Sequence, residues 1–292
     1  MPTILDDLLR TIPVVTDGAW GTQLQERGLP IGACPDLWNL THPEKVREVA
    51  RAYVEAGSRV ILTNTFGANR FVLDRHGAGA QAAEIARAGV EISRAAAGER
   101  ARVFASLGPS GKMLAMGEVA EGELRAAFEE TAGALAAAGA DGIVVETMSE
   151  LAEARLAVAA AAATGLPVVG SMVFDSGRDG MHTMMGETPE QTAEALAAAG
   201  AAAIGSNCGR GAEQMLPVCE RLRAATGLPV WIKPNAGAPE LVAGRAVYRT
   251  TPAEFVRHML AIAAAGASLI GGCCGTTPEH LRALVTAVNG RL

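Results

Sequence analysis

The sequence predicts an α/β fold, a single-domain (β/α)8 barrel that spans residues 1–292. Three observations support this prediction: a length that suits one such barrel, eight short apolar runs along the chain, and a unit of helix end, glycine and apolar run that recurs four times. Eight strands that alternate with helices favour the closed barrel, with an open doubly wound sheet as the alternative.

The eight apolar runs are the predicted strands. Four follow the recurring unit, and the glycine before each lies where a helix needs a left-handed cap; they are residues 60–64, 143–146, 203–207 and 269–273. These runs are apolar on both faces, as buried parallel strands are. The other four are residues 14–17, 103–107, 168–172 and 230–233, of which the last two each follow a Thr-Gly-Leu-Pro turn.

Helix starts are marked by threonines. A threonine hydroxyl and a carboxylate or amide three residues later form a capping box, which satisfies backbone N–H groups that the first helical turn leaves free. The predicted pairs are Thr41 with Glu44, Thr188 with Gln191, Thr251 with Glu254, and Thr276 with Glu279.

Composition narrows the range of partners. The net charge of -6 and the lack of a basic stripe argue against nucleic acid. Apolar stretches such as residues 157–163 are too short to span a bilayer, and the first seven residues lack a secretion signal. Five scattered cysteines do not form a secreted disulfide framework. We therefore expect a cytoplasmic protein with a small-molecule substrate and no membrane partner.

Polar side chains gather where the predicted strands end. Active sites of (β/α)8 barrels are built at the carboxyl ends of the strands, so these residues predict the site. They are Asp17, Asn64, Glu146, Asn207, Cys208, Asn235, Cys273 and Cys274.

Three of these residues are thiols in a pattern typical of a metal site. Cys273 and Cys274 are adjacent within Gly-Gly-Cys-Cys-Gly, and Cys208 follows another strand. Adjacent residues on a regular strand face opposite ways, so both can bind one ion only if the backbone leaves strand geometry, which the flanking glycines allow. The pattern predicts a zinc site of three cysteines with a fourth position for substrate. The alternative is a pair of small core residues or a strained disulfide.

The ligand type indicates the chemistry. Three thiolates over-neutralise zinc, so a bound water stays poorly acidified and hydrolysis is disfavoured, whereas a substrate thiol would be held as a reactive thiolate. Two other hypotheses remain. One is a redox or metal sensor in which Cys273 and Cys274 form a disulfide, and the other is a zinc hydrolase or aldolase, which requires a histidine or carboxylate ligand that the sequence does not place there.

The same motifs resemble a known family. They are Asp-Gly-Ala-Trp-Gly-Thr at 17–22, Thr-Asn-Thr-Phe-Gly-Ala-Asn at 63–69, Val-Glu-Thr at 145–147, Ser-Asn-Cys-Gly at 206–209, Lys-Pro-Asn-Ala-Gly at 233–237 and Gly-Gly-Cys-Cys-Gly at 271–275. They cover essentially the entire chain, and the last motif with a distant Asn-Cys is the most specific. The chain resembles the homocysteine S-methyltransferase family, which implies a zinc-dependent transfer of a methyl group to L-homocysteine giving L-methionine.

The resemblance also implies the metal ligands. Cys208, Cys273 and Cys274 would bind zinc, and the thiol of L-homocysteine would complete the tetrahedron. Asn235 resembles the side chain that fills the vacant zinc position before substrate arrives.

By the same resemblance, four residues would hold the amino-acid part of the substrate. Asp17 and Glu146 are similar to the carboxylates that hold the homocysteine ammonium, and the backbone amides around Gly18 and Ala19 would take its carboxylate. The residues agree with this for the two acids, because a zwitterionic amino acid needs a nearby anion.

The methyl donor is less defined. A betaine or sulfonium donor needs an aromatic cage, yet aromatic residues are only 4% of the chain and Gly67 stands where the betaine branch has a tyrosine, leaving Trp38 and Phe66 as candidates. The motifs at 63–69 and 234–237 lie closer to the methionine-synthase branch than to the betaine branch. That resemblance implies methylcobalamin on a separate corrinoid protein as donor, with betaine or S-methylmethionine as the alternative.

The two remaining cysteines are interpreted as structural. Cys219 lies on the apolar face of a predicted helix and is expected in the core, whereas Cys34, beside Pro35 in a predicted loop, is expected to be a spare thiol.

Overall fold

The computed structural model describes residues 3–242 and 245–290, and it confirms the predicted (β/α)8 barrel. Eight parallel strands form one sheet in the order β1-β10-β7-β6-β5-β4-β3-β2, and a bridge between Thr16 and Val60 brings its two ends together. The strands are β1 (Val14–Val15), β2 (Val60–Ile61), β3 (Arg102–Leu107), β4 (Gly142–Met148), β5 (Val168–Met172), β6 (Ala203–Cys208), β7 (Val230–Pro234) and β10 (Leu269–Ile270). The predicted domain ends, residues 1 and 292, lie outside the described residues.

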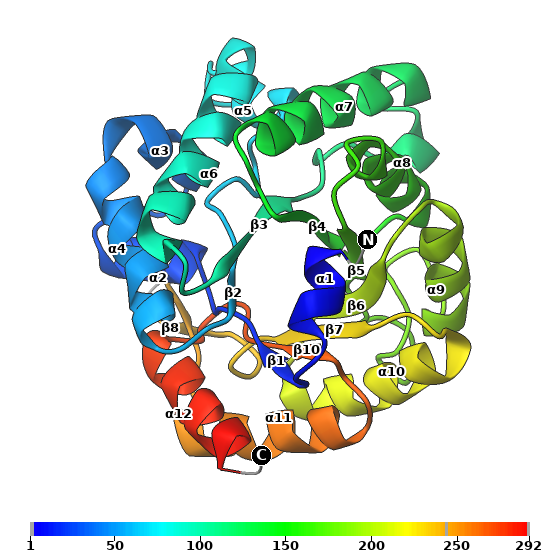
Figure 1. Ribbon diagram of the computed structural model, residues 1–292. Helices are drawn as coiled ribbons and strands as arrows, with labels where there is room; N and C mark the ends of the chain where they lie inside the picture. The colour runs from blue at the N-terminus through cyan, green and yellow to red at the C-terminus, as the bar shows by residue number, and fades with distance from the viewer. Residues whose placement is uncertain (1–2, 243–244, 291–292) are drawn as a thin grey trace.

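Helices surround the strands, one after each (Figure 1). They are α4 (Pro43–Glu55), α6 (Ala82–Ala97), α7 (Glu121–Ala137), α8 (Leu151–Ala162), α9 (Pro189–Ala198), α10 (Ala212–Ala225), α11 (Pro252–Ala264) and α12 (Pro278–Asn289). Shorter helices and 3-10 turns lie in the connections: α1 (Ile4–Leu8), α2 (Gly21–Glu26), η1 (Pro35–Leu37), α3 (Trp38–Thr41), α5 (Arg70–Asp74), η2 (Gly79–Gln81) and η3 (Leu114–Met116). Within the described ranges, we find no helix with the length and hydropathy required to cross a membrane.

The inside of the barrel is filled by apolar side chains from the strands and from α1. Figure 1 shows α1 lying across one end of the barrel, where Leu5 and Leu8 pack on Phe104 and Trp231. The larger apolar cluster lies between the strands and the surrounding helices. Because the strands begin at the end that α1 covers, the polar residues at their carboxyl ends lie at the opposite end.

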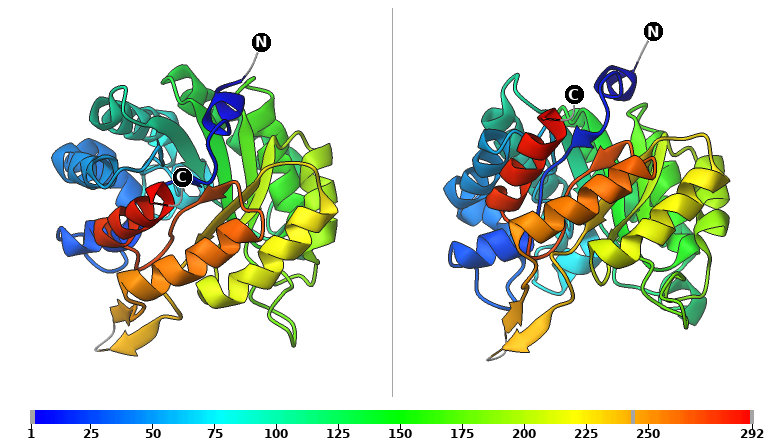
Figure 2. Two further views of the ribbon diagram at one scale, coloured as in Figure 1. Left: turned by 60° about the horizontal axis from the view of Figure 1, so that its bottom comes forward. Right: turned by 90° about the horizontal axis from the view of Figure 1, so that it is seen from below.

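A two-stranded hairpin, β8 (Glu240–Val242) and β9 (Arg245–Val247), follows β7 and was not predicted. Figure 2 shows it projecting at the end of the barrel opposite α1. Strands of three residues are too short to give a recognisable alternation of apolar and polar positions. The hairpin adds to the rim of the barrel mouth, where Leu241 is 81% exposed.

The predicted capping boxes are confirmed at two helices and are wrong at two others. Thr188 and Thr251 cap α9 and α11 as predicted. At α4 the N-cap is His42, because the hydroxyl of Thr41 donates to the carbonyl of Leu37 instead. At α12 the N-cap is Thr277 rather than Thr276.

Three strands end earlier than predicted, at Val15, Ile61 and Ile270. After β10 the backbone passes close to the residues that follow β1: a Cβ added to Gly271 would collide with the side chain of Thr16 and the carbonyl of Asp17. The residues after these strands therefore have irregular backbone. This confirms that Cys273 and Cys274 lie outside regular strand geometry.

Candidate active site

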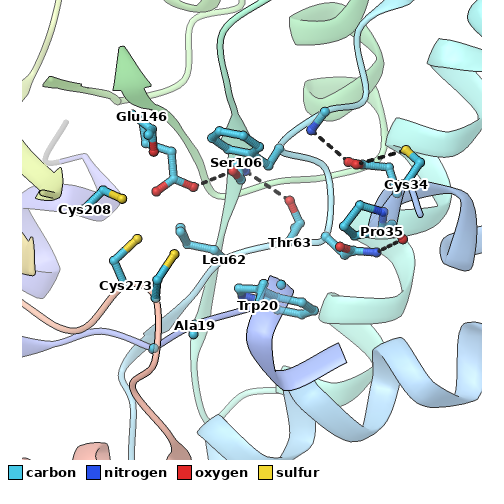
Figure 3. Close-up of a pocket in the computed structure, with 18 of the residues that line it drawn as sticks. Ala19, Trp20, Cys34, Pro35, Leu62, Thr63, Ser106, Glu146, Cys208 and Cys273 are labelled. Carbon is cyan, nitrogen blue, oxygen red and sulfur yellow. Dashed lines mark hydrogen bonds between the residues drawn. The ribbon is translucent and has the colours of Figure 1, made fainter. Parts of the chain in front are cut away.

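Three cysteine sulfurs meet at the carboxyl end of the barrel. Cys208 is the last residue of β6, and Cys273 and Cys274 follow β10. Their Sγ atoms all lie within 4.8 Å of one another, and no histidine or carboxylate among the described residues belongs to the cluster. Figure 3 shows the sulfur atoms of Cys208 and Cys273 directed into one pocket.

Backbone geometry brings these thiols together. Cys208 has a φ of 66°, a conformation that few residues other than glycine adopt, so its side chain leaves the direction of β6. The amide of Cys273 donates to the carbonyl of Pro234 at 2.8 Å, and the hydroxyl of Thr276 donates to the carbonyl of Cys273 at 2.7 Å. The latter contact explains why Thr276 does not cap α12.

Hydrogen bonds among the thiols divide them into one acceptor and two donors. The thiols of Cys273 and Cys274 donate to the sulfur of Cys208 and lower its pKa to about 3. The same contacts raise the pKa of Cys274 to about 11 and that of Cys273 well above its usual value. Of the three thiols, Cys208 is therefore the one whose ionisation the contacts favour.

Asp17 is fully buried and accepts hydrogen bonds from three donors. Its Oδ2 accepts from the indole Nε1 of Trp20 at 2.8 Å and from the amide of Leu62 at 2.7 Å. Its Oδ1 accepts from the ammonium of Lys233, whose side chain is only 2% exposed. Asp17 itself is fully buried and does not line the pocket, whereas Lys233 does.

Glu146, by contrast, lines the pocket beside the thiols (Figure 3). Its Oε1 accepts from the hydroxyl of Ser106 at 2.5 Å, and its Oε2 lies 3.4 Å from the amide Nδ2 of Asn207. Burial raises the pKa of Glu146, and the positive charge of Lys233 opposes this shift. A cationic group that enters the pocket would stabilise the ionised form.

Asn207, on β6, connects the ends of β4 and β5 next to the site through hydrogen bonds. Its Oδ1 accepts from the amide of Thr147 at 2.8 Å and from the hydroxyl of Ser171 at 2.7 Å, while its Nδ2 donates to the hydroxyl of Thr147 at 2.7 Å. Thr147 has a φ of 61°. These contacts fix the chain just after Glu146 and so fix the direction of that carboxylate.

Gly18 and Ala19 line the pocket next to the cysteines. The amide of Ala19 already donates to the hydroxyl of Thr276 at 3.1 Å, and its carbonyl accepts from the phenol of Tyr53 at 2.6 Å. The structure gives no acceptor for the amide of Gly18 among the described residues. Of the two amides predicted to bind a substrate carboxylate, only that of Gly18 is without a protein partner in this part of the chain.

Asn235 lies against Cys208. It contributes a hydrogen bond that lowers the pKa of Cys208, and its Nδ2 donates to the carbonyl of Gly209 at 2.6 Å. Its Oδ1 is buried and has no hydrogen-bond partner among the described residues. A buried amide oxygen without a partner is costly, so this atom is suited to a cation or a substrate donor.

The pocket is a cavity of about 460 Å³ that extends well beyond the thiols. Its far wall is formed by the connections after β1 and β2, where Figure 3 shows Cys34 and Pro35 at the side opposite Cys208 and Cys273. The same connections contribute Asp36, Phe66 and His76 to the residues that line the cavity. The cavity is therefore large enough for a second small molecule next to a bound amino acid.

The far wall corrects two sequence-based interpretations. Cys34 is buried in the pocket wall, with its sulfur 3.6 Å from Asp36, and is not a spare loop thiol. Trp38 does not line the pocket, because its ring stacks on His42 with centroids 4.6 Å apart. Phe66 does line it and is 42% exposed. Cys219 is fully buried, which confirms its expected place in the core.

Sequence reasoning missed Lys233 and Asp36 as site residues. Lys233 was noted as the end of a strand and the start of a family motif but was given no role, although a lone lysine at the carboxyl end of a buried apolar strand is unusual and signals a buried partner. Asp36 gave no such signal, because it lies in the single turn of 3-10 helix η1 within a connection, where acids are common.

Known proteins match the chain along nearly its full length. The chain is 33% identical to the methionine synthases of Mycobacterium tuberculosis and Mycobacterium leprae over 98% and 97% of its length, and it spans about 25% of the length of each. The crystal structure of the metallated form of the homocysteine methyltransferase MmuM from Escherichia coli superposes with a TM-score of 0.80 at 27% identity, covering 97% of this chain and 99% of that one. The sequence profile of the homocysteine S-methyltransferase family matches residues 14–288. The chain belongs to the homocysteine S-methyltransferase family.

Proposed function

We propose that this chain transfers a methyl group to the thiol of L-homocysteine and so forms L-methionine. The observation that carries the proposal is the meeting of three cysteine sulfurs in a cavity that also holds a buried carboxylate, Glu146. Membership of the family supports it. In the net reaction the thiol loses its proton, its sulfur forms the new bond to the methyl carbon, and the donor keeps the electron pair of the bond that breaks.

We propose zinc as the metal, bound by Cys208, Cys273 and Cys274. The donor set fits, because three converging thiols select a soft or borderline cation over magnesium or calcium. The unpartnered Oδ1 of Asn235 beside Cys208 fits its predicted role as an occupant of the fourth position before substrate binds. When bound, zinc would keep a fourth sulfur deprotonated near neutral pH while leaving it nucleophilic.

The chain's own residues would orient the amino acid. Glu146 lines the pocket beside the thiols, so we assign the homocysteine ammonium to its carboxylate. Asp17, predicted to share the ammonium, already accepts three hydrogen bonds, and its direct contact with substrate stays a prediction. Gly18 would supply a backbone amide to the substrate carboxylate, and Ala19 would shape the wall beside it.

For the donor, we propose methylcobalamin carried on a separate corrinoid protein. Exposed apolar residues lie in the connections that follow β2, β3, β5 and β7, at the end of the barrel where the pocket opens. A partner protein that docks at this end would cover them. They are Phe66, Met116, Met184, Met185, Leu241 and Val242. The matched methionine synthases are about four times longer than the matched region, since the chain spans 25% of each, so other parts of those proteins accompany this barrel.

A free sulfonium or betaine donor is the second candidate, and one observation favours it. Asp36, 3% exposed, and Phe66 both line the cavity, and Asp36 accepts a hydrogen bond from the amide of Gly67, the residue after Phe66. A buried carboxylate and an aromatic face suit a cationic methyl donor. The similar protein MmuM is described as a homocysteine methyltransferase, and this chain covers 99% of the MmuM chain in the crystal structure. A barrel of this size therefore also occurs without the additional parts of a methionine synthase.

Two further proposals rest on the sequence. We propose that residues 1–292 form one homocysteine-binding barrel domain, since the family profile covers residues 14–288. We also propose a cytoplasmic location without nucleic-acid or membrane partners, because the cysteine pattern and the net charge of -6 favour it.

The redox or metal sensor and the zinc hydrolase or aldolase are disfavoured alternatives. The sensor predicts reduced protein without zinc and no effect of substitutions at Asp17 or Glu146. The hydrolase requires a histidine or carboxylate ligand, and the cluster formed by the described residues contains only cysteines. Family membership also favours the methyltransferase.

One set of assays tests the proposed function and ranks the donors. The protein is purified under reducing conditions, its zinc is measured by elemental analysis, and methionine formation from homocysteine is measured with methylcobalamin, betaine and S-methylmethionine in parallel. We expect about one zinc per chain and methionine with at least one donor. Absence of methionine with all three donors in the zinc-loaded protein would overturn the proposal.

A further inference from the structure

Lys233 is a buried cation that faces the pocket. It is 1% exposed, lies near the carboxyl end of β7 and lines the cavity that holds the three thiols. Its ammonium pairs with Asp17 and lies 5.6 Å from the ring centroid of Trp231. Burying a lysine is unfavourable unless its charge is paired, so the position requires a reason beyond packing.

The ammonium of Lys233 has N–H donors that do not bind Asp17. A lysine carries three N–H donors, and the structure gives one hydrogen-bond acceptor for them among the described residues, Oδ1 of Asp17. The other donors are on a group that lines the cavity. They are therefore available to an acceptor on a molecule that enters it.

A purely structural ion pair does not account for this arrangement. Asp17 is satisfied on its Oδ2 by Trp20 and Leu62, and it lies behind the pocket wall. Lys233 is among the residues that line the cavity, and Asp17 is not. The cationic member of the pair is therefore the one that lies next to the cavity.

The cavity wall consequently offers three different chemical groups close together. Cys208, Cys273 and Cys274 supply sulfur, Glu146 supplies an anion, and Lys233 supplies a cation. An α-amino acid with a thiol side chain carries the complementary set: a sulfur, an ammonium and a carboxylate.

We propose that Lys233 binds the α-carboxylate of the thiol substrate and, with Glu146 at the ammonium, makes the site selective for zwitterionic amino-acid thiols over thiols that lack either charge. Asp17 is then a positioning residue that holds the ammonium of Lys233 toward the cavity. The inference rests on the proposed function, because it assumes that an amino-acid thiol is the acceptor. It also explains how a substrate carboxylate can bind although the amide of Ala19 is taken by Thr276.

The test compares three thiols: L-homocysteine, 3-aminopropane-1-thiol, which lacks the carboxylate, and 4-mercaptobutanoate, which lacks the ammonium. Binding to the zinc-loaded protein is measured by calorimetry, and KM and kcat are measured with the donor that works best. The variants are Lys233→Met and Glu146→Gln. Lys45→Met is the matched control, because Lys45 is on the exposed surface of α4 and pairs with Glu48.

Lys233→Met should weaken homocysteine binding roughly 10- to 100-fold, the size expected for a hydrogen bond between charged groups, through KM with kcat little changed. It should leave 3-aminopropane-1-thiol unaffected, whereas Glu146→Gln should weaken both of these thiols and leave 4-mercaptobutanoate unaffected. Because Lys233→Met leaves Asp17 buried without its cation, the double variant Asp17→Asn with Lys233→Met is measured as well. It should regain stability and show the same pattern of thiol preference.

Two outcomes separate this inference from the proposed function. If wild-type protein methylates homocysteine but folded Lys233 variants lose the same factor for homocysteine and for 3-aminopropane-1-thiol, Lys233 does not bind the carboxylate and the proposed function stands. If wild-type protein neither binds nor methylates homocysteine, the proposed function is wrong and the inference is wrong with it.

Discussion

The two walls of the cavity contain the same kinds of residue, but the pKa of the cysteine is lowered in one wall and raised in the other. One wall has a thiol and a carboxylate in Cys208 and Glu146, and the other has them in Cys34 and Asp36. Two thiol donors lower the pKa of Cys208 to about 3, whereas burial and the neighbouring Asp36 raise that of Cys34 to about 11. The difference teaches that burial alone does not set the pKa of a thiol here, because the hydrogen bonds that each thiol receives also decide how easily it ionises.

The origin of each wall explains the difference. The thiol wall is built from residues at the ends of β4, β6 and β10, held by Asn207, Thr276 and the sheet. The far wall is built from the connections after β1 and β2, where Asp36 accepts from the amide of Gly67 at 2.9 Å and so joins the two loops. We infer that the first wall is arranged for a metal and substrate, and that the second keeps a loop in place next to the donor.

The largest expected difference between the walls is in metal content. Cys208→Ala and Cys273→Ala should each lose zinc and activity, because two remaining sulfurs cannot complete the site. Cys34→Ala should keep its zinc, since its thiol stays protonated at neutral pH. Elemental analysis and methionine formation measure both, with the core variant Cys219→Ala as the control for a lost buried thiol.

Full zinc content in Cys208→Ala, or loss of zinc in Cys34→Ala, would contradict the predicted difference in metal binding between the two walls.

A smaller difference is expected between the two carboxylates. Glu146→Gln should raise KM for homocysteine roughly 10- to 100-fold, because the amide keeps the hydrogen bond from Ser106 but loses the charge that attracts an ammonium. Asp36→Asn should leave KM for homocysteine unchanged and raise KM for a cationic donor if a sulfonium or betaine is used. Steady-state kinetics with each substrate varied in turn separates the two effects. Equal shifts in homocysteine KM for both variants would contradict the division of the cavity.

The smallest effect concerns the pH dependence of stability. Burial raises the pKa of Asp36 from its usual range near 4 to about 6, so the folded protein holds a proton that the unfolded chain releases in that range. The stabilisation from this proton is present below about pH 4 and is lost as pH rises through about 6, an effect of about 2–3 kcal/mol at most. Asp36→Asn has no such group. Urea unfolding at pH 4 and pH 7 should therefore show the variant gaining stability relative to wild type at the higher pH.

A relative stability of Asp36→Asn that does not change between these two pH values would show that Asp36 is not an unfavourable buried charge.

Much of the fold and of the thiol wall could be predicted because their signals are local. Eight apolar runs, four of them preceded by a helix-end glycine, predicted eight strands in the right places. Gly-Gly-Cys-Cys-Gly predicted that the chain leaves the sheet at the two vicinal cysteines. The place of the third sulfur, that of Cys208, was predicted because the carboxyl ends of all the strands of a parallel barrel lie on the same side. The meeting of Cys208 with Cys273 and Cys274 confirms that prediction of proximity.

The rest depends on contacts between residues far apart in the chain. Lys233 and Asp17 are 216 residues apart, and the hydrogen bond between Ala19 and Thr276 spans 257 residues. The hydroxyl of Thr276 is used there and at Cys273, which is why the local capping pattern failed at α12. No spacing rule reveals such pairs, so the far wall and the buried cation required the three-dimensional structure.

The most direct measurement is X-ray absorption at the zinc edge of the purified protein, with and without L-homocysteine. The account predicts three sulfur ligands at about 2.3 Å in the free protein and a fourth sulfur when homocysteine binds. A zinc ion surrounded by nitrogen and oxygen, or a sulfur count that homocysteine leaves unchanged, would contradict it.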